Sequence, residues 1–245
     1  EIPFVYRIHE APDEEKIRKL AIFLHNFGYT MHIGNHEVHP KEIQKLLAKV
    51  EGKPEEPMIA RLALRSMKQA KYTPENEGHF GLAASCYTHF TSPIRRYPDL
   101  QIHRIIKETL RGRMDEERIR HYQSILEEVT KHASETERRA EEAERETVKL
   151  KKVQYMKNFI GEEYEGVISG ITKWGMYVEL PNTIEGLIHV VNMTDDHYEY
   201  IEDRYEMQGI NTGKTYRLGQ KVCVRVMAAN ELQRTIDFEL GKEGD

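Results

Sequence analysis

The chain has 245 residues and a formal net charge of −5 at pH 7, and 39% of its residues are hydrophobic. That length accommodates one large domain or two ordinary ones with a buried core. Runs of about eighteen apolar residues and signal-peptide features are absent, which excludes a predicted membrane span and secretion signal. The two cysteines, Cys86 and Cys223, fit neither a disulfide framework nor a zinc site, so we expect a cytoplasmic protein.

The N-terminal part is expected to form one strand and three helices. Apolar residues alternate over 4–9, which predicts a strand. Because the chain enters this stretch without an initiator Met, we expect it to be a segment of a longer protein. Apolar residues then recur at helical spacing over 17–27, 43–50 and 59–67, and glycine ends the first two stretches at Gly28 and Gly52. We assign these helices a packing role.

Residues 71–90 lack helical periodicity and predict a loop followed by a strand over 82–90. A hydroxyl residue, Thr91 or Ser92, then offers a cap for a helix that begins at Pro93. Since Pro98 follows too soon for an undisturbed helix, we expect a kink or a restart there.

The second half changes from helix to strand near residue 160. Residues 115–159 are dense in charge, with apolar residues at helical intervals, and predict a long helix that is continuous or broken once. Beyond Gly161, short alternating runs punctuated by glycine predict a small β-barrel. These runs cover 164–168, 175–180, 186–190 and 221–227.

Two adjacent arginines, Arg95 and Arg96, stand at the predicted helix start, and Arg104 follows farther along the helix. Backbone N–H groups at a helix start favour anions, and arginine forks add bidentate phosphate contacts. A phosphate-binding corner is one interpretation. The other is that both arginines are ordinary surface or salt-bridging residues, for example paired with Asp99.

The sequence HFTSPIRRYPDLQIHR over 89–104 resembles the signature near the end of the catalytic domain of the ribonuclease II/R family. The stretch RSMKQAKYTPENEGHFGLA over 65–83 is similar to the same family and nearer to its ribonuclease R branch. This resemblance implies a processive 3′→5′ exoribonuclease that releases nucleoside 5′-monophosphates from single-stranded or structured RNA by metal-assisted hydrolysis. It implies that Arg95 contacts the scissile phosphate as a catalytic residue. It also implies RNA binding by Arg96 and Arg104. The alternative is that either residue only stabilises the fold.

Metal-assisted cleavage requires a cluster of carboxylates around Mg²⁺. The family's aspartate cluster has no counterpart here, so we expect Mg²⁺ in the complete enzyme, its ligands upstream of this chain, and no hydrolysis by the isolated chain. The run over 137–148 resembles the family's final catalytic-domain helix, in which a glutamate near Glu144 has a functional link. A solvated helix glutamate is the competing interpretation of Glu144.

The segment 161–241 resembles an S1-type RNA-binding domain, an OB-fold barrel of five strands. We therefore predict an α+β chain in which 1–160 is the helix-rich C-terminal part of an RNB catalytic domain. The resemblance implies an RNA face with aromatic residues that stack on bases and basic residues that neutralise phosphates. The aromatic and histidine positions are Trp174, Tyr177 and His189, and the basic candidates are Lys173, Lys221, Arg225 and Arg234.

The placement of the aromatic residues is left open by the strand pattern. By period two, Met176 shares the face of Trp174 while Tyr177 lies opposite, unless a bulge at Gly175 brings both rings together. Met176, which replaces an aromatic residue common in similar domains, reduces the expected stacking surface. Core packing is the alternative role for Trp174, and a neutral structural imidazole is the alternative for His189.

The resemblance implies RNA with a single-stranded 3′ end as the partner. It implies no membrane. We expect a monomer, although the sequence does not determine the oligomeric state. A protein of a different class remains open: a non-catalytic RNA-binding or regulatory protein that retains the S1-type domain.

Overall fold

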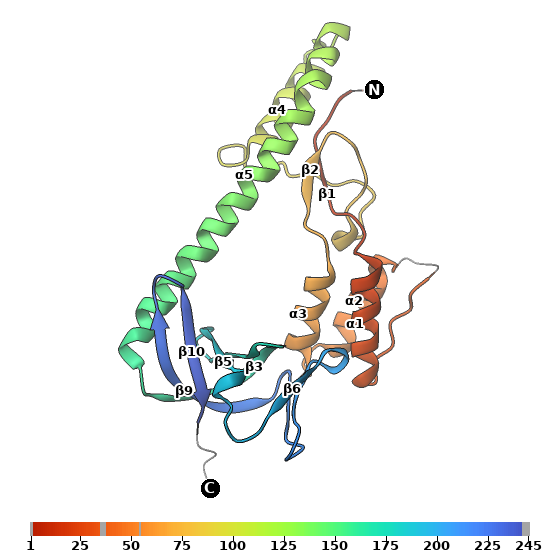
Figure 1. The fold of residues 1–245 in the computed structure, drawn as a ribbon. Coiled ribbons are helices and arrows are strands. Elements are labelled where there is room, and N and C mark those ends of the chain that lie inside the picture. The colour runs from red at the N-terminus through yellow and green to blue at the C-terminus, as the bar shows by residue number, and fades with distance from the viewer. Residues whose placement is uncertain (1, 35–37, 54, 242–245) are drawn as a thin grey trace. The chain divides into compact units, whose positions relative to one another are not determined.

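The computed structural model describes residues 2–34, 38–53 and 55–241 (Figure 1). The helices are α1 (Glu14–Asn26), α2 (Pro40–Val50), α3 (Glu56–Ser66), α4 (Tyr97–Leu110) and α5 (Glu116–Met156), with the short 3₁₀ helices η1 (Phe80–Leu82), η2 (Lys157–Phe159), η3 (Val190–Asn192) and η4 (Glu202–Arg204). The strands are β1 (Tyr6–Ile8), β2 (Lys71–Thr73), β3 (Glu163–Thr172), β4 (Gly175–Glu179), β5 (Glu185–His189), β6 (Tyr198–Ile201), β7 (Glu206–Gly209), β8 (Thr215–Arg217), β9 (Lys221–Asn230) and β10 (Thr235–Leu240). Helices followed by sheets confirm the predicted α+β class.

The chain divides into two compact units, and each is described by itself. The first, called the α4 unit, comprises 1–18, 31–46 and 63–142; the second, the barrel unit, comprises 19–30, 47–62 and 143–245. None of the helices in the described residues is both long and apolar enough to cross a membrane.

In the α4 unit, the short antiparallel pair of β1 and β2 packs against α4 and α5. Its core consists of Val5, Tyr72, Ile102, Ile105, Tyr122 and Leu126. The carboxylate of Asp115 accepts a hydrogen bond from the Arg118 backbone N–H and so caps the start of α5. The helix then continues unbroken for 41 residues, as its long charged and apolar pattern predicted.

The predicted strand over 82–90 is wrong. Ala83 adopts the left-handed conformation with φ of 52° at the end of η1, and this interrupts an extended run. The partner of β1 is instead β2, with Tyr6 opposite Thr73. Residues 83–90 remain irregular, and Tyr87 contributes one backbone bond to the edge of β1, accepted from Arg7 at 2.8 Å.

The predicted helix start at Pro93 is also wrong, whereas the restart at Pro98 is confirmed. The Ser92 carbonyl accepts hydrogen bonds from the backbone N–H groups of Arg95 and Arg96, which closes a turn rather than a helix. Arg96 is extended and serves as the N-cap residue of α4, so Pro98 occupies the first helical turn, where its missing N–H is not needed.

The barrel unit contains the predicted five-stranded barrel, closed in the order β10-β5-β4-β3-β9. Its interior is filled by a continuous set of apolar side chains that includes Met176, Val178, Ile188, Val224 and Phe238. A second sheet, β6-β7-β8, was not predicted, because its strands are only three or four residues long and carry polar side chains.

One glycine of the barrel is required by geometry. Gly175 has a φ of 144°, and a Cβ atom there would lie 2.0 Å from the Ile188 carbonyl oxygen. Only glycine therefore lets β4 begin this close to β5.

Candidate RNA-contacting sites

The two adjacent arginines of the turn before α4 have different surroundings. The guanidinium of Arg96 donates two hydrogen bonds to the buried Asp99 carboxylate, from Nε at 3.1 Å and from Nη2 at 2.8 Å. Arg95 is exposed, and its side chain has no hydrogen bond or ion pair within the part of the chain that the structure describes. Arg95 is thus the free cation of the pair.

The exposed surface next to the turn is partly aromatic and basic. The guanidinium carbon of Arg104, a residue of α4, lies 5.9 Å from the ring centre of Tyr97. Tyr97 is itself half exposed and accepts a hydrogen bond from Gln101. The same α4 unit therefore presents Arg104 and Tyr97 to solvent, although no direct contact links Arg95 to Arg104.

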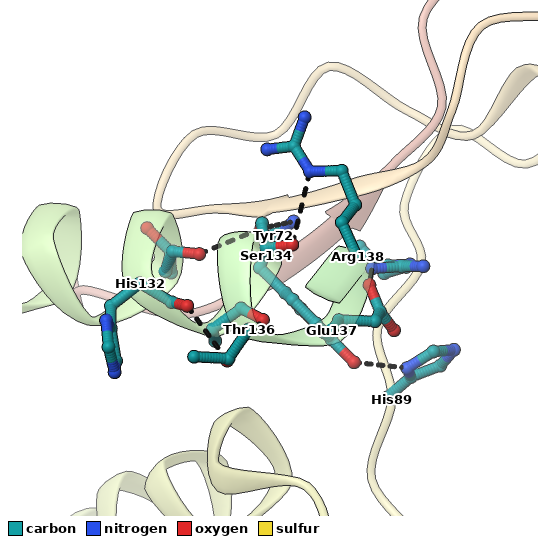
Figure 2. A network of polar contacts seen from close by, with 10 residues as sticks. Tyr72, His89, His132, Ser134, Thr136, Glu137 and Arg138 are labelled. Atoms are coloured by element: carbon teal, nitrogen blue, oxygen red, sulfur yellow. Dashed lines mark hydrogen bonds and ion pairs between the residues drawn. The ribbon is translucent and has the colours of Figure 1, made fainter. Parts of the chain in front are cut away.

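A polar network holds the segment that leads into this turn (Figure 2). The Tyr72 hydroxyl and the His89 Nδ1 atom are 2.8 Å apart, and the Arg7 guanidinium carbon lies 4.5 Å above the Tyr72 ring. Arg7 also donates to the Glu137 carboxylate at 2.6 Å. Sequence reasoning missed this network, because its members come from four segments up to 130 residues apart and no spacing connects them.

Burial shifts the titration of both ring groups in the network. It raises the pKa of Tyr72 to about 12, with the Glu137 carboxylate adding to the rise. It also lowers the pKa of His89, helped by the positive charges of Arg96 and Arg7. His89 therefore favours the neutral form, which suits an uncharged hydrogen-bond partner for Tyr72 better than a phosphate ligand.

In the barrel unit, Trp174 is presented to solvent from the turn between β3 and β4. Its side chain is 58% exposed, and the Lys173 ammonium lies 4.8 Å from the centre of its ring. Core packing of Trp174 is thereby excluded. The prediction that Trp174 and Met176 share a face is also wrong, because Trp174 precedes β4 and strand alternation does not extend to it.

Alternation does hold within β4 itself. Met176 is fully buried in the barrel core, so it does not belong to a stacking surface, which corrects that expectation. Tyr177 points to the opposite, outer side, and its Cα partner on β5 is Leu187. The pairing irregularity in this region lies in β3, between Ile168 and Gly170, rather than at Gly175.

His189 ends β5 opposite Gly175 and is partly exposed. Its Nδ1 atom accepts a hydrogen bond from the Val191 backbone N–H at 3.5 Å, which caps η3. His189 therefore caps η3 and also lies at the surface. Trp174, Tyr177 and His189 accordingly come from one turn and two neighbouring strands, and we call this surface the β4–β5 face.

Several candidate cations of the barrel unit already have anionic partners. Arg234 pairs with Glu146 of α5, and Arg225 bridges Glu163 and Glu239. Lys221 and Lys173 are exposed. Glu144 is an exposed helix glutamate. The positive charge of Arg234 is therefore largely compensated within the fold.

Within the described ranges, the acidic residues do not form a metal centre. Among the residues that the structure describes, no three His, Cys, Asp or Glu side chains are grouped so as to hold an ion. Asp196 instead accepts hydrogen bonds from Thr212 and Asn211, and the bonds from Thr212 are the main cause that holds the pKa of its carboxyl well below the usual range. The acidic side chains of the described residues therefore do not fit an Mg²⁺ site.

Two protein-family models match separate parts of the chain. Residues 1–112 match the RNB domain family, and residues 157–241 match the S1 RNA binding domain family. The chain therefore carries a match to the RNB domain followed by a match to the S1 RNA binding domain.

Two curated relatives named ribonuclease R align with nearly the whole of this chain. The chain is 47% identical to ribonuclease R of Aquifex aeolicus over 240 residues and 42% identical to ribonuclease R 1 of Lactococcus lactis over 238 residues. These alignments cover 97% of this chain in both cases and 34% and 29% of the two relatives, so the chain spans about a third of their length. Over nearly all of its length, the chain is thus similar to proteins named ribonuclease R.

A solved structure has the same fold over nearly the whole chain. Mycoplasma genitalium RNase R in complex with ribose methylated single-stranded RNA superimposes with a TM-score of 0.90 and 25% sequence identity. The match covers 98% of this chain and 38% of that protein.

Proposed function

We propose that this chain supplies the phosphate-contacting and RNA-gripping part of a processive 3′→5′ exoribonuclease that releases nucleoside 5′-monophosphates. The observation that carries the proposal is the Arg95 side chain, which is exposed and has no anionic partner among the described residues. The second arginine of the same turn, Arg96, is already paired with Asp99. A guanidinium fork placed there stabilises charge that develops on a phosphoryl oxygen in the transition state.

The β4–β5 face is proposed to hold the incoming single strand. Trp174 supports this role because an exposed indole with an adjacent ammonium stacks on any base and attracts the neighbouring phosphate. Tyr177 and His189 extend the surface along two strands. Arg104 on α4 is proposed as a further RNA contact. The charge of Arg234 is largely compensated by its ion pair with Glu146, so its proposed contribution to RNA binding is small.

We propose that the cleavage step requires Mg²⁺ bound by carboxylates outside this chain. When bound, the metal would activate water and stabilise the phosphoryl oxygens. The lack of a carboxylate cluster in the described ranges supports a division of labour in which this chain contributes Arg95 and the RNA grip. We propose a border between the two sequence domains near residue 160, where η2 gives way to β3. We also propose that the protein is a cytoplasmic monomer.

The test is to incubate this chain with 5′-labelled single-stranded RNA and Mg²⁺. Binding is followed by gel shift and cleavage on a denaturing gel. Salt-sensitive binding without shortening is expected. Progressive shortening from the 3′ end would overturn the claim about the metal ligands, and a folded chain that binds no RNA would overturn the RNA-gripping role.

A second measurement separates the enzyme from the non-catalytic alternative. The same assay is run on the protein extended by its native upstream sequence. Shortening of RNA that depends on Mg²⁺ supports the nuclease, whereas RNA binding without cleavage supports a regulatory RNA-binding protein.

A further inference from the structure

The paired arginines of the turn occupy environments that assign them different tasks. We infer that Asp99 and Arg96 form a brace that positions Arg95, so that Arg96 is a positioning residue and not an RNA ligand. This inference rests on the proposed function of Arg95.

The brace is built on one carboxylate oxygen. Asp99 is fully buried, and its Oδ2 atom accepts the backbone N–H of Ser92 at 2.8 Å together with the two guanidinium bonds of Arg96. Ser92 in turn accepts the backbone N–H groups of Arg95 at 3.3 Å and Arg96 at 3.0 Å. Every backbone bond that closes the turn around Arg95 therefore begins or ends at Ser92, which Asp99 holds.

The other oxygen of the same carboxylate shows why Arg96 stays in place. Asp99 Oδ1 is buried and has no hydrogen-bond partner among the described residues. A buried carboxylate with one oxygen unsatisfied depends on its counter-ion, since an unpaired buried charge is strongly unfavourable. If Arg96 swung out to a phosphate, it would leave Asp99 without that counter-ion.

The position of Asp99 in the fold makes the brace local. It lies in the first turn of α4, three residues after Arg96, where the N-terminal end of the helix also favours a negative charge. The turn is thus fixed before RNA arrives. A guanidinium that is already placed loses less freedom when it contacts a phosphate, and such pre-organisation favours catalysis.

The first test uses the unmodified chain. NMR signals of the arginine Nε–H groups are followed by solvent exchange and by titration with short oligouridine. We expect the Arg96 Nε–H to exchange slowly and keep its position, and the Arg95 signal to shift. Rapid exchange at Arg96, or a shift of Arg96 as large as that of Arg95, would overturn the brace.

The second test uses the salt dependence of oligouridine binding. Each phosphate contact on a single strand contributes a slope of about 0.7 in log K against log salt. If Arg96 only positions Arg95, then Arg95→Ala, Arg96→Ala and the double variant each lower the slope by about 0.7. Two independent contacts would instead lower it by about 1.4 in the double variant, which contradicts the inference.

Two variants complete the design. Asp99→Asn keeps the shape of the side chain but removes its charge, and we expect faster exchange at Arg96 and a smaller RNA-induced shift at Arg95. Arg120→Ala, on the exposed side of α5, removes an arginine outside the turn and is expected to leave the slope unchanged. If Arg95→Ala leaves the slope unchanged while Arg96 stays protected, the proposed function fails and the Asp99–Arg96 contact stands as purely structural.

Discussion

The turn before α4 and the β4–β5 face hold their candidate RNA contacts in opposite ways. In the turn, Arg95 depends on a few polar bonds that converge on Asp99. On the face, Trp174 and Tyr177 depend on a closed barrel whose core is spread over five strands. The turn is therefore sensitive to single polar changes, whereas the face is sensitive to loss of the core.

The largest effect is expected from the barrel core. Phe238 is fully buried, and its ring fills the space next to Gly186, where even a Cβ atom would lie 2.6 Å from it. Phe238→Ala leaves a cavity and should lower the free energy of unfolding by about 3–5 kcal/mol. Urea unfolding followed by circular dichroism measures this loss.

The matched control is Leu232→Ala in the β9–β10 loop, since Leu232 is 97% exposed. We expect a change within about 0.5 kcal/mol for that variant. Equal stabilities of the two variants would show that the face does not rely on the barrel core.

The next effect concerns the turn. If the proposed function holds, Arg95→Ala in the protein extended by its native upstream sequence should slow turnover on the order of a hundredfold, the typical cost of losing a transition-state donor. Single-turnover cleavage of labelled RNA measures the step. Arg120→Ala is the control, and an unchanged rate in Arg95→Ala would remove Arg95 from the catalytic residues.

The sequence predicted the elements better than the contacts. Helical periodicity over 17–27 and 115–159 and alternation beyond Gly161 reproduce α1, α5 and most barrel strands, because these patterns are set by local burial. The predicted strand over 82–90 was wrong because alanine gives no sequence signal for the left-handed conformation that Ala83 adopts.

The candidate site was predictable only in part. Resemblance indicated Arg95 and Trp174, and the structure leaves both side chains exposed. The sequence left open whether Asp99 pairs with Arg95 or Arg96, since the two arginines precede it by four and three residues. The choice depends on how Ser92 closes the turn, which residue spacing alone does not specify.

A smaller effect is expected on the β4–β5 face. Trp174→Ala should weaken binding of single-stranded RNA by about 1–3 kcal/mol, because one stacking ring is lost from an exposed position. Fluorescence anisotropy with labelled RNA measures the affinity. Leu232→Ala again serves as the control, and equal affinities of the two variants would contradict the stacking role.

The smallest effect concerns an ion pair that resembles the Asp99–Arg96 brace but lies nearer to solvent. Arg61 of α3 donates to Glu179 of β4 at 2.6 Å, with side chains 35% and 34% exposed. Because water screens such a pair, a double-mutant cycle of Arg61→Ala and Glu179→Ala should give a coupling of only about 0.2–1 kcal/mol that weakens with salt.

The control cycle uses Arg120 and Glu116 of α5, an Arg–Glu pair separated by 4.0 Å with side chains 71% and 92% exposed. We expect its coupling to be near zero. A coupling for Arg61 and Glu179 no larger than that of the control would show that proximity alone gives no stabilisation at this face. The strength of the Asp99–Arg96 brace would then be attributable to the burial of its carboxylate, since the chemistry of the two pairs is the same.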